Sequence, residues 1–268
     1  IGSAVINSLL NNTNLKVINI DKESYASDHQ RIKSILSKIK DAKNRYIFHK
    51  VNLINHELTK QIISNYNPDF IIHLAAESHV DRSISGPREF IESNILGTYN
   101  LLDSTLHYWE KLKGNKKNNF RLLHVSTDEV YGSLGQTGQF DEKSNYSPNS
   151  PYSASKASSD HLVQAWYHTY GLPTLITNCG NNYGPWQFPE KLIPLSISKA
   201  IKNEKIPLYG NGENIRDWIF VDDHADALLT ILHKSSVGKK YCIGGYQEKS
   251  NKAVVEEICK FLDSLNIK

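Results

Sequence analysis

The stretch from Phe70 to Ser126 contains three segments: FIIHLA at 70–75, PREFIESNILGTYNLLDSTLHYW at 87–109 and RLLHVS at 121–126. The first and last are short apolar runs, typical of buried strands. In the middle segment, residues at three- or four-residue intervals predict a helix with one buried stripe: Ile91, Ile95, Thr98, Leu102 and Leu106. This alternation of strand and helix predicts a parallel sheet.

The same alternation continues on both sides of this stretch. Further strands are predicted at Lys16–Ile20, Tyr46–Val51 and Thr174–Asn178, and further helices at about Ser153–Tyr170 and Ser250–Leu265. From Gly180 to Pro194 the sequence is rich in Asn, Pro, Gly and aromatic residues, which predicts a long loop of the kind that often carries function. We therefore expect a doubly wound α/β domain over 1–178 and a smaller α/β portion over 179–268, with parts of 217–247 returning to the first domain.

Composition excludes several classes of protein. The 268 residues carry 31 Lys+Arg and 28 Asp+Glu, a net charge of +3 that is too small and dispersed for a nucleic-acid surface. No apolar run approaches the roughly 18 residues of a membrane span, and no signal peptide is recognisable, so we expect a cytoplasmic protein. The three cysteines show no Cys-x-x-Cys spacing and the histidines no coherent ligand set, so neither a disulfide framework nor a metal site is expected.

The first residues have the pattern of a helix rather than of a chain start. Residue 1 is Ile, and Ile1-Gly2-Ser3-Ala4 fits the body of a helix. We therefore expect the natural chain to begin upstream.

Asp21 ends the run KVINI, about 19 residues after Gly2. This spacing suits the acidic residue that hydrogen-bonds the adenosine ribose in dinucleotide-binding folds, and it favours NAD over NADP. A strand-end Asp that caps the following turn is the alternative interpretation.

A Tyr-x-x-x-Lys pattern occurs twice. Tyr152 and Lys156 lie at the start of a predicted helix, where they share a face, so the ammonium can lower the pKa of the phenol and let it act as a base. Tyr46 and Lys50 lie on a predicted strand, where they are roughly 13 Å apart and cannot couple. Only the helical pair is chemically usable.

Two adjacent carboxyls follow the strand at 121–126. Thr127, Asp128 and Glu129 come at its carboxyl end, the edge of an open α/β sheet at which ligands bind. An Asp-Glu pair at a strand end is often a solvated turn, but its place before the usable tyrosine favours a catalytic role.

Six motifs resemble the dTDP-glucose 4,6-dehydratase family, in the nucleotide-sugar branch of the extended short-chain dehydrogenase/reductase superfamily. They are LAAESHVDRS (74–83), STDEVYG (126–132), SPYSASKASSD (150–160), NNYGP (181–185), PEKLIP (189–194) and RDW (216–218). The Thr-Asp-Glu triplet discriminates best, because related epimerases and decarboxylases lack that carboxyl pair. The resemblance implies a Rossmann-like NAD-binding domain, a homodimer, and dehydration of dTDP-glucose to a 4-keto-6-deoxy sugar of the kind used in dTDP-rhamnose biosynthesis.

The resemblance also implies a role for each matching residue. Tyr152 takes the proton of the 4-hydroxyl, Lys156 holds the nicotinamide ribose, Thr127 hydrogen-bonds the same oxygen as Tyr152, Glu129 removes the hydrogen at carbon 5 and Asp128 protonates the departing 6-hydroxyl. The NAD-binding residues implied are Gly2, Asp21, Asn52, Leu74, Ala75, Ala76, Ser78, Ser93, Tyr152, Lys156 and Asn182. The substrate-binding residues implied are Ser78, Thr127, Asn181, Lys191, Leu192, Tyr209, Arg216 and Asn251.

Some features depart from the family pattern. Asn52 stands where an Asp usually contacts the adenine, although an amide can still hydrogen-bond there. The family pattern also has a first strand and most of a glycine loop before Gly2, and it normally continues beyond Lys268. Two alternatives stay open: a UDP-sugar dehydratase or decarboxylase of the same superfamily, and a non-catalytic NAD-binding module. The dimer is expected to form through the helices at 87–109 and 153–170, whose outer faces are predicted to carry Tyr108 and Trp166.

Overall fold

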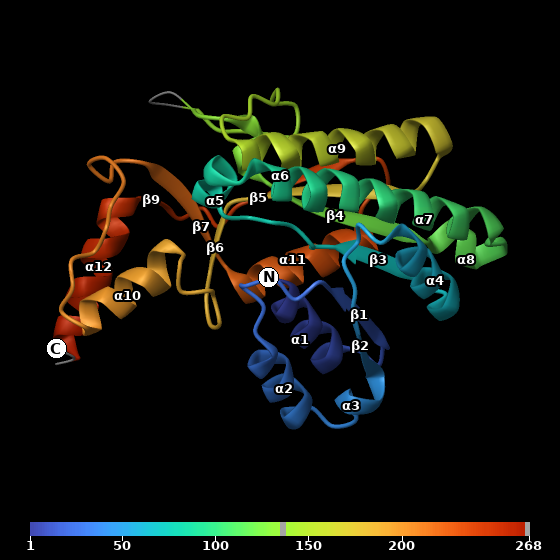
Figure 1. Ribbon diagram of the computed structural model, residues 1–268, viewed down its shortest axis with the longest axis horizontal. Coiled ribbons are helices and arrows are strands. Elements are labelled where there is room, and N and C mark those ends of the chain that lie inside the picture. The colour runs from blue at the N-terminus through green and yellow to red at the C-terminus, as the bar shows by residue number, and fades with distance from the viewer. Residues whose placement is uncertain (135–137, 266–268) are drawn as a thin grey trace. The chain divides into compact units, whose positions relative to one another are not determined.

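The computed structural model describes residues 1–134 and 138–265 (Figure 1). The chain divides into a larger unit, residues 2–179 and 226–243, and a smaller unit that holds residues 180–225, the described residues from 244 onward, and Ile1. The chain thus enters the smaller unit at Gly180, where sequence set the boundary at 179. The segment that returns to the larger unit is 226–243, which lies within the expected range 217–247.

The larger unit contains two groups of parallel strands. β1 (Val17–Asp21) pairs with β2 (Tyr46–Lys50). The second group is a four-stranded sheet in the order β3 (Phe70–His73), β4 (Arg121–Thr127), β5 (Thr174–Cys179), β8 (Lys240–Ile243). The predicted parallel α/β fold is confirmed, and each of the five predicted strands is present, with ends that differ by at most two residues.

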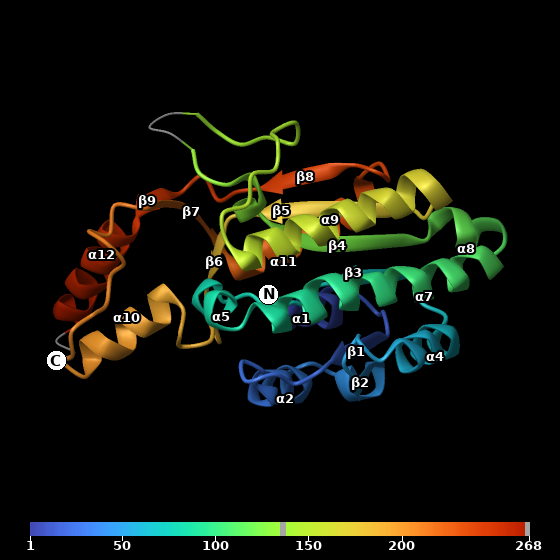
Figure 2. The ribbon, with the colours of Figure 1, turned by 45° about the horizontal axis from the view of Figure 1, so that its top comes forward.

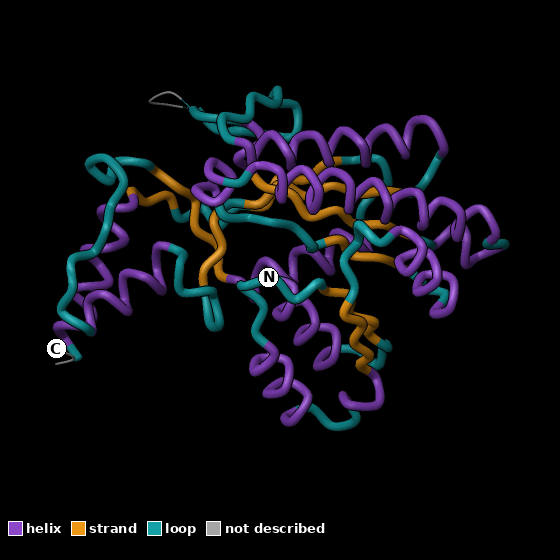
Figure 3. The backbone as a smooth tube through the Cα atoms, viewed as in Figure 1, coloured by secondary structure: helices purple, strands orange, loops and turns teal. Residues whose placement is uncertain are grey.

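Helices alternate with these strands along the chain (Figure 3). In the larger unit they are α1 (Gly2–Asn12), α2 (His29–Lys38), α3 (Ala42–Arg45), α4 (His56–Tyr66), α5 (Val80–Ser85), α6 (Pro87–Phe90), the π-helix η1 (Ile91–Leu96), α7 (Gly97–Lys111), α8 (Gly114–Asn119), the 3₁₀-helix η2 (Asp128–Tyr131) and α9 (Pro151–Tyr170). α11 (Val221–Lys234) begins in the smaller unit and continues into the larger one. No helix in the described part of the chain is long and apolar enough to cross a bilayer.

The core of the larger unit explains why its central strands are apolar. β4 is buried from Leu122 onward, and all six residues of β5 are buried. α7 and α9 lie side by side over one face of the sheet, where Leu102 and Val163 pack against Leu122, and α11 lies on the other face (Figures 1 and 2). Strands covered on both faces become continuous apolar runs, and this is the pattern that the sequence shows.

The buried stripe predicted for 87–109 is wrong at its start, because the helix contains the π-turn η1. Ile91 is 50% exposed, whereas Phe90 and Asn94 are 2% and 1% exposed. A π-turn inserts one extra residue and rotates the following helix face. The expectation that Tyr108 lies on an outer face is also wrong: it is buried, and its hydroxyl donates to the Pro68 carbonyl over 2.7 Å.

A cavity of about 790 Å³ lies between the two groups of strands in the larger unit. Within residues 1–134 and 138–265, β1 pairs only with β2, and β3 only with β4. Residues of both β1 and β3 line the cavity, together with Val5, Ile6 and Leu9 of α1. Its lining includes Gly2, Asp21, Leu74 and Ala75, four of the residues expected to bind NAD.

The smaller unit contains a mixed sheet and two helices. β7 (Ile215–Phe220) pairs in parallel with β6 (Asn181–Tyr183) and antiparallel with β9 (Glu248–Ser250). α10 (Leu192–Ile201) packs against α12 (Asn251–Ser264), which confirms the predicted C-terminal helix. The loop predicted at 180–194 is wrong in part, since β6 and the start of α10 lie within it. β6 reads Asn-Asn-Tyr, and a strand this short and polar has no apolar run to reveal it.

Candidate active site

The predicted catalytic triplet of Thr127, Asp128 and Glu129 lies where β4 ends. Thr127 is the last residue of β4, and its hydroxyl accepts a hydrogen bond from the Glu129 amide over 3.3 Å, which caps the 3₁₀-turn η2. The same hydroxyl lies 3.1 Å from Oδ1 of Asp128, to which it donates. Thr127 is 8% exposed, whereas Asp128 and Glu129 are half-buried. Both carboxyl-bearing residues therefore lie beside a buried hydroxyl and still reach solvent.

The start of α9 fixes the Tyr–Lys pair. Ser150 and Ser153 form a reciprocal capping box, and Pro151 occupies the first turn, so the helix begins there. Tyr152 and Lys156 consequently lie one turn apart on a helix, as predicted, and both are buried. The other Tyr-x-x-x-Lys pattern lies on β2, which confirms that only one copy can couple.

The electrostatics of Tyr152 differ from expectation. Burial raises the pKa of Tyr152 well above its ordinary value, and the charge of Glu129 raises it further, while a hydrogen bond with Thr127 lowers it. The ammonium of Lys156 instead donates to the Val125 carbonyl over 3.0 Å. The net direction is therefore opposite to the expected one, so the phenol keeps its proton near pH 7. A lowering of this pKa by Lys156 stays a prediction.

Six of the eleven residues expected at the cofactor lie at or just after the carboxyl ends of β1, β2 and β3: Asp21, Asn52, Leu74, Ala75, Ala76 and Ser78. Oδ1 of Asp21 accepts from the Glu23 amide over 2.7 Å, so its carboxylate is fixed in an exposed turn. Asn52, after β2, accepts from the Ile54 amide over 3.1 Å. Ala75, Ala76 and Ser78, after β3, are exposed. An exposed acid after β1 and small residues after β3 fit the adenosine end of a dinucleotide.

A buried polar cluster that the sequence analysis missed connects β1 to α9. Lys22 lies 2.6 Å from a carboxylate oxygen of the buried Glu77 and donates to the Ser93 hydroxyl over 2.8 Å. Asn94 bonds both the amide and the carbonyl of Glu77 and donates to Ser155 over 2.8 Å. The Ser155 hydroxyl in turn donates to the Tyr152 carbonyl. One feature of the sequence could have indicated this cluster: Asn94 is a polar residue on an otherwise apolar helix face.

The residues of the smaller unit that were expected to bind the substrate, and Asn182, which was expected to bind NAD, lie on its sheet or in the segments around α10 and α12. Asn181 and Asn182 belong to β6, and Arg216 to the neighbouring β7. Lys191 caps α10, which begins at Leu192, and Asn251 begins α12. Tyr209 is 73% exposed, in the segment between α10 and β7. The structure thus gathers the two asparagines and the arginine on two paired strands.

His224 is a second residue that the sequence analysis missed. It is fully buried, and its Nδ1 lies 2.7 Å from Oδ1 of Asn182, while the amide of Asn182 donates to the Gly180 carbonyl over 3.1 Å. Burial lowers the pKa of His224 to about 4, so the ring is neutral near pH 7 and its Nδ1–H can donate to Asn182. His224 therefore fixes the orientation of Asn182.

The low pKa of His224 predicts a loss of stability in mild acid. Its folded pKa of about 4 lies below the ordinary histidine value of 6.5, so the unfolded chain binds the proton first and stability falls as pH drops from 6.5 toward 4. Between pH 7 and 4.5 the free energy of unfolding should fall by about 2 kcal/mol more for the wild type than for His224→Asn, which keeps a donor but does not titrate. Urea unfolding at both pH values measures this, and equal losses in the two proteins would contradict it.

Among the described residues, no three His, Cys, Asp or Glu side chains gather closely enough to hold a metal ion.

Known proteins resemble this chain over nearly its whole length. The family model for GDP-mannose 4,6 dehydratase matches residues 1–266. The chain is 50% identical to dTDP-glucose 4,6-dehydratase 1 of Escherichia coli K12, over 99% of this chain and 74% of that protein. These two matches confirm the family resemblance that the motifs indicated.

Two solved structures are similar as well. One is the dTDP-glucose 4,6-dehydratase of Bacillus anthracis in complex with NAD, with 43% identity, a TM-score of 0.81, and 93% of this chain and 73% of that chain covered. The other is a dTDP-glucose 4,6-dehydratase of Streptomyces venezuelae with NAD bound, with 38% identity, a TM-score of 0.87, and 100% and 78% covered. Both have the parallel α/β fold described above.

Proposed function

Because the chain belongs to the GDP-mannose 4,6 dehydratase family, we propose that it is a dTDP-glucose 4,6-dehydratase, a hydro-lyase that uses NAD. It converts dTDP-glucose to dTDP-4-keto-6-deoxyglucose and water. The observation that carries this proposal is the pair Asp128–Glu129, which lies at the end of β4 beside Thr127 and acts on the pKa of Tyr152. A simple dehydrogenase or epimerase needs the Tyr–Lys pair but has no use for two further carboxyls.

The chemistry explains why oxidation must precede elimination. The hydrogen at carbon 5 of glucose is not acidic, whereas a ketone at carbon 4 makes it so. Tyr152 accepts the proton of the 4-hydroxyl, and Thr127, which hydrogen-bonds Tyr152, orients the same oxygen. NAD, when bound, would supply the redox chemistry, as the acceptor of the carbon-4 hydride that ends at carbon 6.

The carboxyl pair then carries out the elimination. Glu129 removes the hydrogen at carbon 5 as a base, and Asp128 protonates the 6-hydroxyl as it leaves as water. The two roles require one ionised and one protonated carboxyl. Neighbouring carboxyls favour this division because their like charges repel.

Residues of the larger unit offer a fitting cofactor site. Asp21 would hold the adenosine ribose, Asn52 the adenine, and Lys156 the nicotinamide ribose, with Gly2, Leu74, Ala75, Ala76, Ser78 and Ser93 around them. In the smaller unit, Asn182 on the nicotinamide side and the residues Asn181, Lys191, Leu192, Tyr209, Arg216 and Asn251 on the substrate side stay predictions. Arg216 is suited to phosphate oxygens because its guanidinium can bind them in a bidentate manner.

Incubation of the NAD-loaded protein with dTDP-glucose and, separately, with UDP-glucose tests the proposal. We expect a product from dTDP-glucose that is lighter by one water and shows the alkaline absorbance of a 4-keto-6-deoxy sugar. Faster turnover of UDP-glucose would favour a UDP-sugar dehydratase, and an unchanged substrate in both reactions would contradict the proposal.

We also propose that the protein is a homodimer. Large apolar side chains remain exposed on η1 and α7, namely Ile91 (50%), Leu96 (46%) and Tyr99 (41%), and Tyr170 of α9 is 50% exposed. Such a cluster marks an interaction surface.

Both NAD and nucleotide sugars are cytoplasmic metabolites, so we place the dimer in the cytoplasm.

Leu96→Glu should convert the dimer to a monomer, because a buried unpaired charge is costly at an apolar interface. Sedimentation velocity measures the change. Leu58→Glu, at a similarly exposed leucine (42%) on α4, is the matched control and should leave the dimer intact. A dimer that persists in Leu96→Glu would exclude this surface.

A further inference from the structure

A second buried charge lies one helical turn beyond Lys156. Asp160 is fully buried and Lys156 is 3% exposed, and residues four apart on α9 share a face. A buried ammonium is costly unless an opposite charge or hydrogen bonds compensate for it. The Val125 carbonyl gives Lys156 a hydrogen bond but no counter-charge.

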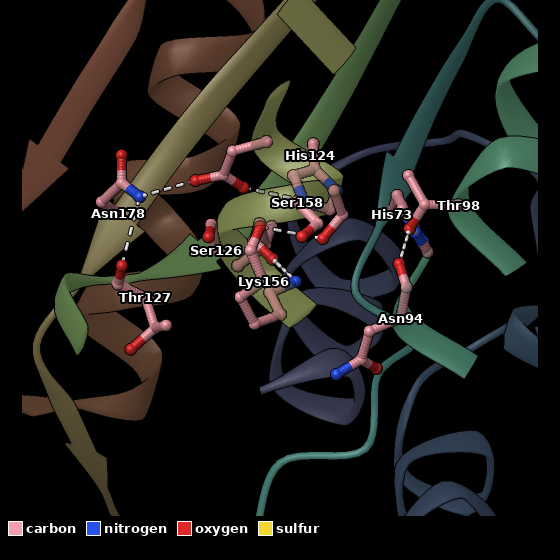
Figure 4. A network of polar contacts seen from close by, with 12 residues as sticks. His73, Asn94, Thr98, His124, Ser126, Thr127, Lys156, Ser158 and Asn178 are labelled. Atoms are coloured by element: carbon pink, nitrogen blue, oxygen red, sulfur yellow. Dashed lines mark hydrogen bonds and ion pairs between the residues drawn. The ribbon is translucent and has the colours of Figure 1, made fainter. Parts of the chain in front are cut away.

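Three side chains contact the carboxylate of Asp160. Oδ2 accepts from the Tyr146 hydroxyl over 2.8 Å and from the Asn178 amide over 3.1 Å. Oδ1 lies 3.2 Å from Nε2 of His124 on β4 (Figure 4). A carboxylate with this many polar neighbours stays ionised despite its burial.

Asn178 extends this network to the catalytic turn. The amide nitrogen that donates to Asp160 also donates to the Thr127 carbonyl over 3.2 Å (Figure 4). The amide oxygen of Asn178 accepts from the Tyr131 hydroxyl over 3.2 Å. Both ends of the Asn178 amide are therefore occupied. The side chain of Asn178 thus links Asp160 to the backbone that immediately precedes Asp128 and Glu129.

The other titratable groups around the pair cannot supply the missing negative charge. His124 of β4 and His73 of β3 face it with ring centroids 5.0 Å apart, and burial lowers the pKa of both, which keeps them neutral. Burial raises the pKa of Tyr146 and Tyr152, so both phenols stay protonated. Cys179 of β5 acts on Lys156 only when it is a thiolate.

The pKa values of the two partners agree with this arrangement. Burial lowers the pKa of Lys156, and the charge of Asp160 raises it. Burial raises the pKa of Asp160, but its contact with His124, the charge of Lys156 and the hydrogen bond from Tyr146 bring the pKa below its ordinary value.

We propose that Asp160 is a positioning residue, whose carboxylate balances the buried charge of Lys156 and, through Asn178, holds the Thr127 carbonyl that aligns the Asp128–Glu129 turn. The catalytic consequence rests on the proposed function. The charge balance does not, and it has a test of its own.

A stability cycle tests the charge balance without any assay of activity. Asp160→Asn should lower the melting temperature, and adding Lys156→Met should restore most of the loss, because the double variant buries no uncompensated charge. If Asp160→Asn alone does not fold, the double variant still should. Asp69→Asn with Lys116→Met, an exposed pair 3.5 Å apart, is the matched control and should show purely additive effects. Additive losses at Asp160 and Lys156, or a double variant that is no better folded than Asp160→Asn, would overturn the proposal.

A pH profile tests the positioning role. For folded, NAD-loaded Asp160→Asn, kcat for dTDP-glucose should fall about 10- to 100-fold with KM within about twofold, and the alkaline limb of kcat should move about one pH unit lower as Lys156 loses its proton more easily. Tyr146→Phe removes one hydrogen bond but keeps the carboxylate, so its alkaline limb should stay in place. An unshifted limb in Asp160→Asn would overturn the role, whereas a wild-type protein inactive on dTDP-glucose would refute only the proposed function.

Discussion

Tyr152→Phe should abolish oxidation at carbon 4 while dTDP-glucose still binds with nearly unchanged affinity. The buried ring packs edge-on against Phe90, with centroids 6.3 Å apart, and a phenylalanine keeps that contact. Only the group that accepts the proton of the 4-hydroxyl is lost, and removal of a general base typically costs about 10²- to 10⁴-fold in rate. Absorbance of NADH in a single turnover, together with calorimetric titration of dTDP-glucose, measures both effects.

Tyr167→Phe provides the control for this variant, because Tyr167 lies on the same helix outside the site. It should oxidise dTDP-glucose at the wild-type rate. If Tyr152→Phe forms NADH as fast as the wild type, Tyr152 is not the base.

Glu129→Gln should let NADH accumulate. The first hydride transfer remains possible because Tyr152 and Lys156 are unchanged, but the hydrogen at carbon 5 cannot be removed. The overall rate should fall about 10²- to 10⁴-fold. Removal of the Glu129 charge also removes one cause of the high pKa of Tyr152, so oxidation itself should not slow. Stopped-flow absorbance of NADH and the rate of product formation separate the two steps.

Asp128→Asn distinguishes the two carboxyls. It should permit slow exchange of the carbon-5 hydrogen with solvent while it hinders loss of the 6-hydroxyl, since an amide is a far weaker proton donor than a carboxylic acid. If Glu129→Gln and Asp128→Asn both turn over near the wild-type rate, with no NADH signal and unchanged deuterium incorporation at carbon 5, the roles of this pair must be abandoned.

The fold could be predicted from sequence where burial leaves a direct pattern. β4 and β5 are buried along almost their whole length, so their apolar runs gave the strand positions to within two residues. The face of the helix at 87–109 could not be predicted in the same way. A helical period assumes a constant 3.6 residues per turn. The π-turn at Ile91–Leu96 interrupts that period, and no residue type in the segment indicates it.

The candidate site, too, could be predicted from sequence only in part. The Tyr152–Lys156 pair could be chosen over Tyr46–Lys50 because helix and strand periods differ. The rise in the pKa of Tyr152 could not be predicted, because it depends on burial and on the charge of Glu129. Only the folded chain brings that charge close to Tyr152. The contacts of Asn94, Asp160 and His224 were missed for the same reason: each bonds residues distant in sequence.

Turnover of dTDP-glucose that carries deuterium at carbon 4 tests the central claim most directly. If the NAD-loaded protein oxidises carbon 4, eliminates water through Glu129 and Asp128, and returns the same hydride, the 4-keto-6-deoxy product will carry the label at carbon 6. A label that is found again at carbon 4, as epimerisation would leave it, or that is lost to solvent, would contradict the account.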